Sequence, residues 1–553
     1  KPKAPWLNQY PRNVDWLLDI QVRPVYALID DAVGAFPENP FLDFFGRQYT
    51  YAQAARLIAK TAAGLQQLGV GKGTKVGLFL PNSPYSVICY YAILKIGGIV
   101  VNYDPLCAEL QLIRQIEDSE TEIIVTLDLT PFLSKATAAR AETGLRHIVV
   151  CSLARQLPVF RGMLFRIIHW REVSRPPREE AYVLFEKLID NDGAYQTVEI
   201  APLKDLAVIQ YTGGTTGEPK GVMLSHQNLY ANACQGRAWF TRAEPGRERL
   251  LAIVPFSHAF GMTAVMNFAV SLGGELVIFP RFNLKQMLRA IGRKRVTILA
   301  GVPTLFQAIN QSTETKRYDL SSLKFGVSGG DFLPLPVQET FVELAGCPLA
   351  EGYGLTESSP VVTCTNPFEG VERPGSCGLP LPRTTVEIVS PQSPYTVLPA
   401  GEVGEICVSG PQVMLGYWRQ ADATRRALVD GRLHTGDIGR MDDDGFLYFV
   451  DRLKEVISTH GYKVYPRNVE NAIRRHPAVV DATVIGVPDP MRGQAVKAYV
   501  VLAKGTQLSE AALQDFLADK LSPVEIPRLI EFCEDLPKST IGKVLKRAVA
   551  HHA

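Results

Sequence analysis

The sequence lacks the features that identify secreted, membrane-spanning and nucleic-acid-binding proteins. Its nine cysteines are scattered and form no C-x-x-C pair or zinc-binding spacing, which argues for reduced thiols in a cytoplasmic setting. No apolar run reaches the ~20 residues that a membrane-spanning helix needs. The start of the chain is polar and rich in proline, so we expect no signal peptide there. A net charge of +2 gives no reason to expect a nucleic-acid partner.

The chain instead has the size and pattern of a multidomain α/β protein. Its 553 residues predict two or three domains, and 46% hydrophobic residues are typical of a soluble globular protein. Strand-like and helix-like segments alternate up to about residue 390, which predicts α/β layers with a mainly parallel sheet. Short strands between glycine and aspartate turns at 401–448 predict an antiparallel β module. We therefore predict a large N-terminal domain at 1–451 and a small, mobile α+β domain at 452–553.

A loop rich in glycine and threonine, 211–221, separates two segments that are predicted to be strands. It reads Tyr-Thr-Gly-Gly-Thr-Thr-Gly-Glu-Pro-Lys-Gly. Glycines allow backbone N–H groups to approach an anion, threonine hydroxyls add donors, and Lys220 adds a positive charge. A Walker A loop is excluded because the lysine precedes the glycine and a strand follows instead of a helix. The loop predicts phosphate binding, and the alternative is an ordinary hairpin turn.

This loop resembles the signature of the AMP-forming, adenylate-forming enzymes, which include acyl-CoA synthetases, luciferases and the adenylation domains of peptide synthetases. Further motifs that resemble those of the family follow in the expected order, so the resemblance covers nearly the whole chain. They are Gly352-Tyr-Gly-Leu-Thr-Glu357, His434-Thr-Gly-Asp437, Asp451-Arg452, Thr459-His-Gly-Tyr-Lys-Val-Tyr-Pro466 and Pro537-Lys-Ser-Thr-Ile-Gly-Lys543. The resemblance implies the adenylate-forming fold, with ATP, Mg²⁺ and coenzyme A as cofactor and co-substrates.

The resemblance also implies the site residues. Those expected to contact the nucleotide or the co-substrate are Thr212, Gly213, Gly214, Thr215, Thr216, Gly217, Lys220, Gly329, Gly330, Glu351, Gly352, Tyr353, Gly354, Thr356, Asp437, Arg452, Lys454 and Gly461. Thr212 and Glu357 are the expected Mg²⁺ contacts, which suits a hard cation that takes oxygen ligands. The expected catalytic residues are Lys543, His258 and Glu357.

Several of these assignments have simpler alternatives. Lys543 resembles the lysine that stabilises the adenylation transition state, but it could be a surface lysine. His258 resembles a contact to the acyl carboxylate, or it is a packed core histidine. Asp451 and Arg452 could form only a surface ion pair. Lys454 falls at the hinge of the family.

One position departs from the family and one tryptophan is ambiguous. Several relatives carry a lysine where this chain has Ser458, which leaves open the cation that holds the phosphate, with Lys463 as a candidate. Trp239 either borders an acyl tunnel or belongs to the core.

The reaction that the resemblance implies has two steps. A carboxylate attacks the α-phosphate of ATP to give acyl-AMP and pyrophosphate, and coenzyme A then takes the acyl group. The motifs look most like those of bacterial long-chain fatty-acyl-CoA synthetases. A medium-chain or aryl-acid CoA ligase, an acyl-AMP ligase serving a carrier protein, a luciferase and a non-enzymatic fatty-acid carrier remain alternatives.

The segment 158–173 interrupts the α/β pattern with arginines between large apolar residues. One interpretation is a basic amphipathic helix at the surface of a bilayer. The other is a helix packed on the protein with its arginines reaching the solvent. The expected location is cytoplasmic, with peripheral attachment at the inner face of the membrane and a homodimer both left open.

Overall fold

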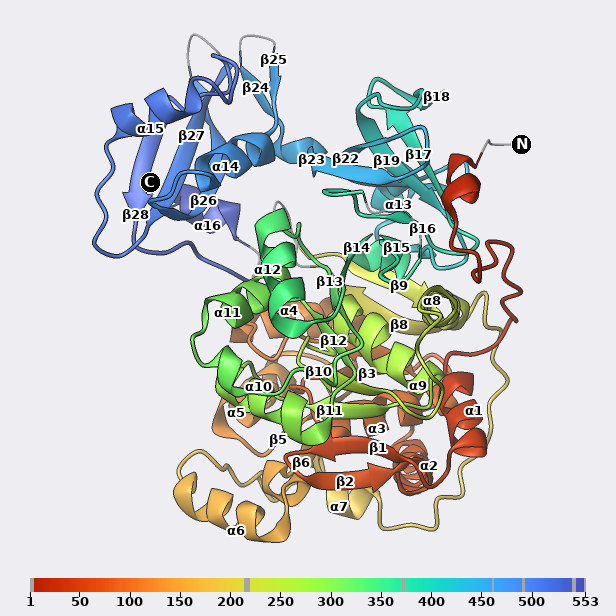
Figure 1. Cartoon of the computed structure of the whole chain (residues 1–553). Helices are drawn as coiled ribbons and strands as arrows, with labels where there is room; N and C mark the ends of the chain where they lie inside the picture. Colours follow the sequence, from red (N-terminus) through yellow and green to blue (C-terminus); the bar gives the residue numbers. More distant parts are fainter. Residues whose placement is uncertain are drawn as a thin grey trace.

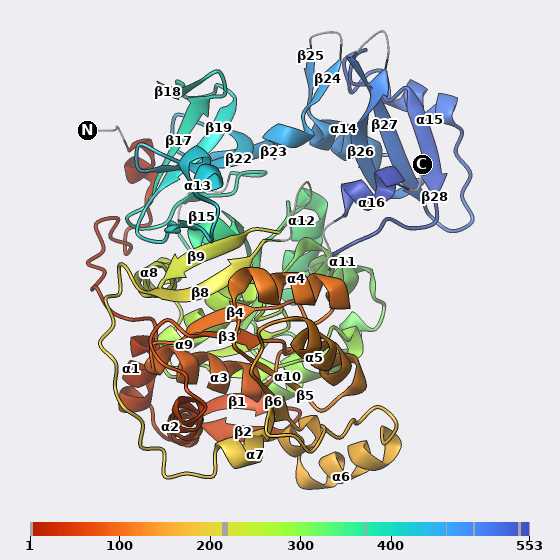
Figure 2. The same ribbon diagram turned by 180° about the vertical axis from the view of Figure 1, so that it is seen from behind.

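The computed structural model describes residues 4–212, 219–369, 371, 373–459, 462–489, 493–539 and 544–551. The predicted fold class is confirmed: two mainly parallel α/β sheets and an antiparallel β module precede a small α+β unit at the C-terminal end (Figure 1). Seen from behind, the C-terminal strands and helix α6 lie at opposite ends of the molecule (Figure 2). No helix in these ranges has the length and apolar character needed to span a bilayer.

The first large sheet has nine strands. In spatial order they are β16 (Leu379–Pro380), β15 (Val361–Cys364), β14 (Leu349–Gly354), β13 (Phe325–Ser328), β12 (Ile298–Gly301), β10 (Arg249–Ala252), β11 (Glu275–Ile278), β1 (Pro40–Phe44) and β2 (Arg47–Thr50). The strands from β14 to β1 pair in parallel, so their carboxyl ends meet at one edge of the sheet. Ligand sites in such sheets lie at this edge.

The second large sheet has eight strands. In order they are β20 (Gly416–Tyr417), β9 (Gly221–Ser225), β8 (Leu206–Tyr211), β4 (Ile99–Asn102), β3 (Lys75–Leu78), β5 (Ile123–Leu127), β6 (His147–Cys151) and β7 (Tyr182–Leu184). The predicted strands on both sides of the phosphate loop are β8 and β9, which pair in antiparallel fashion at the end of an otherwise parallel run. The short strand β20 extends this end through β9.

Two smaller sheets follow. The antiparallel module contains β18 (Ser393–Val397), β17 (Thr385–Ser390), β19 (Gly404–Ser409), β22 (Arg432–Met441), β21 (Leu428–Val429) and β23 (Leu447–Arg452). The C-terminal sheet contains β25 (Tyr462–Val464), β24 (Ile457–Thr459), β27 (Gly493–Leu502), β26 (Val479–Asp489) and β28 (Leu529–Cys533). A single 3₁₀ turn, η6 (Leu453–Glu455), connects β23 to the C-terminal sheet.

Helices accompany all of these sheets. They are α1 (Ala27–Ala35), α2 (Tyr51–Gln67), α3 (Pro84–Lys95), α4 (Glu109–Ser119), α5 (Thr130–Glu142), α6 (Val159–Ile168), α7 (Phe185–Leu188), α8 (His226–Trp239), α9 (Phe268–Ser271), α10 (Leu284–Lys294), α11 (Pro303–Gln311), α12 (Leu335–Ala345), α13 (Ala421–Ala427), α14 (Pro466–Arg474), α15 (Glu510–Leu517) and α16 (Lys546–His551). The eleven-residue α3 core, from Pro84 to Leu94, is fully buried between layers, which explains why it is apolar on every side.

A capping box fixes where α8 begins, immediately after β9. The Ser225 hydroxyl accepts from the Asn228 N–H, and the Asn228 side chain accepts from the Ser225 N–H. Each bond satisfies a backbone group that a helix end would leave unpaired. The Asn228 amide also donates to the carbonyls of Pro411 and Val413, 2.9 Å away in each case. Hydrogen bonds therefore connect the start of α8 both to the end of β9 and to the segment that leads to β20.

The core accounts for two features left open by the sequence. Trp239 is fully buried, and its indole N–H donates to the Thr365 carbonyl over 3.4 Å. Tyr10 of the N-terminal arm packs edge-on against it with ring centroids 5.4 Å apart. Trp239 is therefore a core residue. All nine cysteines are free thiols, and seven of them are buried.

Candidate active site

The residues that flank the phosphate loop form the closed end of a hairpin. Thr212 N–H donates to the Lys220 carbonyl over 3.0 Å, and Lys220 N–H donates to the Thr212 hydroxyl over 3.3 Å. Gly221 is required at the start of β9, because a Cβ there would lie 2.9 Å from Ile209 and 3.3 Å from Trp418. Between these ends, Gly213, Gly214, Thr215, Thr216 and Gly217 lie outside the described residues, so phosphate binding by the loop stays a prediction.

Tyr417 joins two of the predicted site residues. Its hydroxyl donates to Oε1 of Glu357 over 2.9 Å, and the Lys220 ammonium lies 4.6 Å from the centroid of its ring. Burial raises the pKa of Glu357, while the Tyr417 hydrogen bond and the Lys220 charge lower it. Strand pairing between β20 and β9 places Tyr417 beside the loop hairpin. Tyr417 was not predicted from the sequence as a site residue, because its partners are distant in the chain.

The donor set of Thr212 and Glu357 fits a magnesium ion. A carboxylate and a hydroxyl are hard oxygen ligands, which Mg²⁺ prefers. A divalent cation beside Glu357 would also favour the ionised carboxylate that burial disfavours. Thr356 and Glu357 lie on the 3₁₀ turn η5 (Thr356–Ser358) at the end of β14.

An apolar pocket lies at the carboxyl edge of the nine-stranded sheet. Its walls include Phe240 directly after α8, Phe268 of α9, Ile298 of β12, Val327 of β13 and Leu381. Among the described residues that line it there is no aspartate, glutamate, lysine or arginine. The pocket therefore offers room to an uncharged, apolar group.

Predicted site residues gather at one part of this pocket. His258, Gly329, Gly330, Gly352, Tyr353, Gly354 and Thr356 all line it. His258 is half-buried, and its Nδ1 accepts from the Phe260 N–H over 3.3 Å at the start of the π-helix η3 (Phe260–Asn267). Gly329 must be small, because a Cβ there would lie 3.3 Å from the Phe260 ring. His258 therefore borders the pocket, and its contact with the acyl carboxylate stays a prediction.

A polar cleft adjoins the apolar pocket and shares four residues with it: Gly330, Gly352, Tyr353 and Gly354. The predicted residues Glu351, Asp437 and Arg452 line the cleft, together with charged residues of the C-terminal unit such as Arg467 and Lys546. Parallel pairing of β13 with β14 brings these segments together, with Ser328 opposite Glu351. An apolar chamber and a charged cleft thus meet at the ends of two neighbouring strands.

Asp437 lies in this cleft on β22 and is held from two sides. The Tyr353 hydroxyl donates to its Oδ2 over 2.8 Å, and Arg452 Nε lies 3.8 Å from its Oδ1. Cross-strand pairing of β22 with β23 places Asp437 opposite Arg452. The Asp437 N–H donates to the Thr435 hydroxyl over 3.1 Å. Residues predicted from three separate motifs are therefore assembled around one carboxylate.

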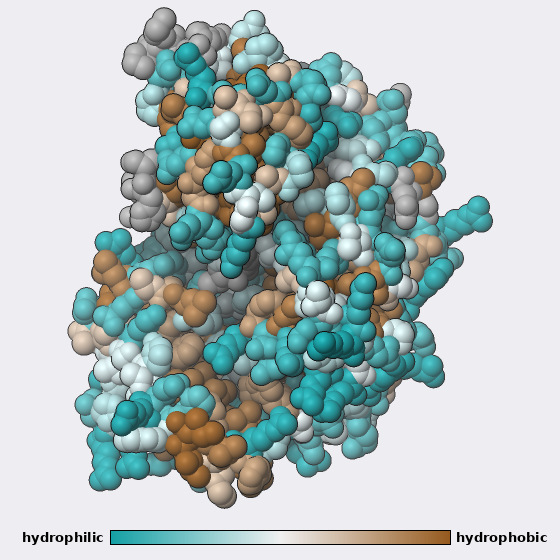
Figure 3. All heavy atoms as spheres, turned by 60° about the vertical axis from the view of Figure 1, so that its left-hand side comes forward, coloured by the Kyte–Doolittle hydropathy of each residue, from teal (hydrophilic) through white to brown (hydrophobic). Residues whose placement is uncertain are grey.

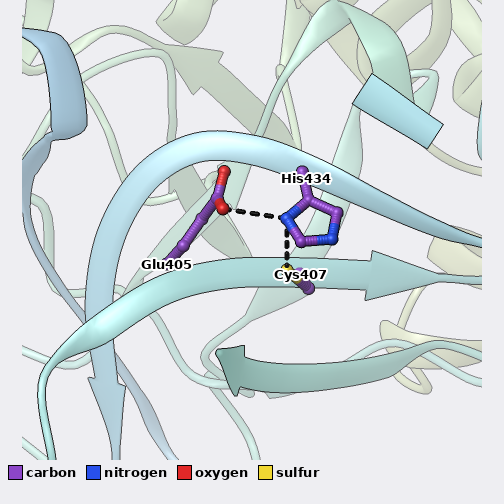
Figure 4. Close-up of side chains that lie close together, drawn as sticks. All are labelled: Glu405, Cys407 and His434. Atoms are coloured by element: carbon purple, nitrogen blue, oxygen red, sulfur yellow. Dashed lines mark hydrogen bonds and ion pairs between the residues drawn. The ribbon is translucent and has the colours of Figure 1, made fainter. Parts of the chain in front are cut away.

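Three side chains from β19 and β22, Glu405, Cys407 and His434, lie close together, and His434 is three residues before Asp437 (Figure 4). His434 Nδ1 lies 2.8 Å from Oε2 of Glu405 and 3.4 Å from Sγ of Cys407. In the described part of the chain this is the one cluster with the composition of a metal site. Its contacts are those of a hydrogen-bonded network, because both partners face the same ring nitrogen and Glu405 also accepts from the Gly436 N–H over 2.9 Å. Burial and Glu405 raise the pKa of the Cys407 thiol, which disfavours a metal-binding thiolate.

Glu351 is the most strongly perturbed carboxyl at the site. It is 4% exposed, and burial raises its pKa from 4.5 to about 7. Its Oε1 accepts from the Leu333 N–H over 3.1 Å, which fixes the loop that follows Gly330. Gly330 has a φ of +85°, a conformation that favours glycine. The predicted Gly329-Gly330 turn is therefore held against β14 by a buried carboxyl.

Arg467 links the C-terminal unit to the rest of the site. Its guanidinium lies 4.6 Å from the ring centroids of both Phe332 and Phe449, and 3.4 Å from Oδ1 of Asp331. Its backbone N–H donates to Oδ2 of Asp451 over 2.8 Å. Arg467 was not predicted from the sequence, because its neighbours come from two distant segments, the loop after β13 and strand β23.

Comparison with known proteins identifies the family. Residues 29–418 match the AMP-binding enzyme family, and residues 468–543 match the AMP-binding enzyme C-terminal domain. The chain belongs to the AMP-binding enzyme family. It is 39% identical to a long-chain-fatty-acid–CoA ligase of Bacillus subtilis (strain 168), over 99% of this chain and 97% of the relative. It is 35% identical to the enzyme of the same name from Escherichia coli O6:H1, over 100% and 98%.

Solved structures of AMP-binding enzymes share the whole fold. ATP-bound MatB from Rhodopseudomonas palustris has a TM-score of 0.83 at 28% identity, covering 96% of this chain and 98% of MatB. The anthranilate CoA ligase AuaEII, in complex with anthranoyl-AMP, has a TM-score of 0.83 at 25% identity, covering 97% and 98%. The adenylate-forming fold expected from the motifs is confirmed.

The remaining predicted residues of this AMP-binding enzyme lie in or beside the C-terminal unit. Lys454 lies on η6, where the chain leaves the antiparallel module. Lys463 is exposed and pairs across β25 and β24 with Ser458, away from the residues that line the cleft. Gly461 and Lys543 lie outside the described residues, so their roles stay predictions.

Proposed function

We propose that this AMP-binding enzyme activates a long-chain fatty acid with ATP and transfers the acyl group to coenzyme A. The observation that carries the proposal is the junction of an uncharged apolar pocket with a charged cleft at Gly330, Gly352, Tyr353 and Gly354. An apolar acyl chain fits the first chamber and a nucleotide fits the second. The names of the two long-chain ligases that match over nearly the full length support the same substrate class.

The reaction proceeds in two steps that need no covalent enzyme intermediate. A carboxylate oxygen of the fatty acid attacks the α-phosphorus of ATP, the bond to the β-phosphate oxygen breaks, and pyrophosphate leaves with the electron pair. The thiol sulfur of coenzyme A then attacks the acyl carbon of acyl-AMP, AMP leaves, and the thiol proton is released. The enzyme contributes positioning and charge stabilisation.

Each predicted residue has a role in this scheme. Asp437, oriented by the Tyr353 hydroxyl, accepts hydrogen bonds from the ribose hydroxyls, and Arg452 beside it contacts the ribose and phosphate. His258 borders the apolar pocket where the fatty-acid carboxylate would lie. Lys543 stabilises negative charge between the attacking carboxylate and the α-phosphate.

The phosphate end of the nucleotide is held by the loop hairpin. We expect Lys220 and the loop N–H groups to bind the phosphates, and Thr212 and Glu357 would hold Mg²⁺. The ion would neutralise part of the charge of the triphosphate. The hydroxyl of Tyr417 contacts the Glu357 carboxylate, and its ring contacts the Lys220 ammonium. One residue therefore holds both groups in the same region of the site.

The two half-reactions use different positions of the C-terminal unit, 452–553. The chain crosses to this unit through η6, so a change of backbone angles near Lys454 would rotate it as a body. One position brings Lys543 to the α-phosphate, and the other brings the loop at Gly461 to the channel for coenzyme A. The free state of all nine cysteines supports a location in the reducing cytoplasm.

The test is pyrophosphate release with ATP, Mg²⁺ and palmitate, with and without coenzyme A. Sustained release with palmitoyl-CoA as product is the expected result. Pyrophosphate release that yields no thioester would assign the chain as an acyl-AMP ligase. Release with benzoate or a medium-chain acid, but not with palmitate, would keep the mechanism and overturn the substrate.

A further inference from the structure

Helix α6 presents its apolar side chains to the solvent. Val159, Phe160, Met163, Leu164, Ile167 and Ile168 are exposed, from 44% at Leu164 to 83% at Val159. Their spacing of four residues places them on one side of the helix, which we call the α6 apolar face. Figure 3 shows brown side chains gathered at the lower edge of the molecule, where Figure 1 places α6. The helix packs on the protein with its arginines exposed, as one interpretation predicted, but its large apolar residues also face the solvent.

The orientation of α6 is fixed by contacts on its opposite side. Gly162 is the one buried residue of the helix, and a Cβ there would lie 2.3 Å from the Ala154 carbonyl oxygen. Arg161 Nη1 donates to the Phe45 carbonyl over 2.9 Å. The helix therefore packs through its glycine and one arginine, and this packing turns the large apolar residues outward.

The stretch around the α6 apolar face carries a net positive charge. Residues 153–180 include six arginines and three acidic residues, Glu172, Glu179 and Glu180, in a chain whose net charge is only +2. The exposed arginines of this stretch are Arg155, Arg161, Arg166, Arg171, Arg175 and Arg178. Trp170, 65% exposed, follows the helix with the Arg171 guanidinium 5.1 Å from its ring centroid. Large apolar residues, a tryptophan and flanking arginines are the composition of interfacial membrane helices.

We propose that the α6 apolar face docks onto the surface of an anionic phospholipid bilayer. The ten residues of α6 extend roughly 15 Å, about half of the hydrocarbon thickness, so the helix lies in the interface. A second copy of the chain is a poorer occupant, since a two-fold axis through this face would bring its arginines together. Anionic lipid headgroups neutralise them instead.

This inference rests on the proposed function, because a long-chain fatty acid partitions into bilayers and an enzyme at the bilayer surface would meet it there. The α6 end of the molecule lies opposite the C-terminal sheet in both ribbon views (Figures 1 and 2). Docking through α6 therefore leaves the unit 452–553 free to move during catalysis. Vesicle binding needs no ATP or fatty acid, so it is measured independently of the ligase reaction.

The experiment is sedimentation of the purified full chain with phosphatidylglycerol vesicles and with phosphatidylcholine vesicles. We expect binding to the anionic vesicles that weakens as salt is raised. Phe160→Asp and Ile167→Asp should each lower the vesicle partition coefficient by roughly tenfold or more. Arg166→Gln and Arg171→Gln should each lower it by about fivefold, on anionic vesicles only.

Leu106→Asp is the matched control, because Leu106 is 73% exposed, lies outside α6 and undergoes the same change of charge. It should bind vesicles as the wild type does, and all variants should keep the wild-type melting temperature. As a second measurement, brominated lipids should quench part of the tryptophan fluorescence of the wild type. This quenched part should be absent from Trp170→Phe. Absence of wild-type binding, an equal loss in Leu106→Asp, or a dimer that Phe160→Asp converts to monomer would each overturn the proposal.

Discussion

The hydroxyl of Tyr417 donates to Oε1 of Glu357 over 2.9 Å, on the same ring that lies 4.6 Å from the Lys220 ammonium. Glu357 belongs to η5, Lys220 precedes β9, and Tyr417 belongs to β20. Three chain segments therefore meet at one phenol. This ring sets the distance between the carboxylate proposed to hold Mg²⁺ and the cation proposed to bind phosphate.

Replacement of Tyr417 by phenylalanine keeps the ring next to Lys220 and removes the donor to Glu357. That hydrogen bond lowers the pKa of Glu357, so its loss raises the pKa further and lets protons compete with Mg²⁺ at higher pH. We expect the acid limb of pyrophosphate release to move to higher pH. The Mg²⁺ concentration for half-maximal rate should rise about tenfold, as for a lost hydrogen bond to a charged group.

The control for this prediction is Tyr395→Phe, which changes a tyrosine that is 64% exposed. It should leave both the pH profile and the Mg²⁺ requirement as they are in the wild type. A Tyr417→Phe variant with the wild-type acid limb would show that the hydroxyl does not tune Glu357.

Glu351→Gln tests the buried carboxyl. Because burial raises the pKa of Glu351 from 4.5 to about 7, the folded state binds the proton more tightly than the unfolded state between these values. The free energy of unfolding therefore falls as pH rises through this window and levels off above it. Glutamine removes the ionisation and should add up to about 3 kcal/mol of stability above neutral pH.

Urea unfolding at roughly pH 5 and pH 8 measures this effect. The gain of Glu351→Gln should be present at the higher pH and small at the lower one. The exposed Glu402 provides the control through Glu402→Gln. Parallel pH dependence in wild type and Glu351→Gln would contradict the assignment.

The network beside Asp437 leads to a prediction on nucleotide binding. Glu405 accepts from the Gly436 N–H and contacts His434 Nδ1, so it holds the turn that precedes Asp437. Glu405→Gln weakens both contacts and should raise KM for ATP by about tenfold, with little change in kcat. Cys407→Ala removes only a weak contact at 3.4 Å and should leave KM for ATP nearly unchanged. Equal effects, or bound zinc that is lost in Cys407→Ala, would contradict a positioning role.

The sequence predicts those parts of the site whose residues are consecutive in the chain. The strands around the phosphate loop, the turn after β13 and the end of β14 all follow from local apolar runs and glycines. Tyr417 and Arg467 escape this reasoning because their partners lie on other elements, and no local pattern records such contacts. Helix α6 was predictable as a helix, but its exposed face depends on the packing of Gly162 against Ala154.

Trp239 illustrates the same limit on α8. Its position shortly after the phosphate loop made it a candidate for the wall of an acyl tunnel, yet the helix turns it into the core. Asn232, Gly236 and Phe240 of the same segment line the pocket instead. The periodicity of a helix gives the residues that share a face, and the neighbouring elements decide what that face meets.

Gly236 controls the room in the apolar pocket. A Cβ on Gly236 would lie 3.4 Å from the Phe268 ring, so alanine fits and a larger side chain projects into the pocket. We expect Gly236→Leu to lower kcat/KM for palmitate while sparing shorter acids, by about fourfold for each methylene left unburied. Gly236→Ala is the matched control and should keep the wild-type profile. A uniform loss across all chain lengths would show that the change affects folding and not the pocket.

Lys543→Ala separates the two half-reactions. The ammonium of Lys543 is proposed to stabilise charge only while the carboxylate attacks the α-phosphate, so acid-dependent formation of acyl-AMP should fall by about 10²-fold or more. Formation of acyl-CoA from supplied acyl-AMP should stay within a few-fold of the wild type, because the proposed second step uses the loop at Gly461 and not Lys543. Pyrophosphate release measures the first step and thioester formation the second. The exposed Lys504 offers a control through Lys504→Ala, which should change neither rate. Equal loss of both steps in Lys543→Ala would contradict a specific role of Lys543 in adenylation. It would also contradict the proposal that the unit 452–553 serves each half-reaction in a different position.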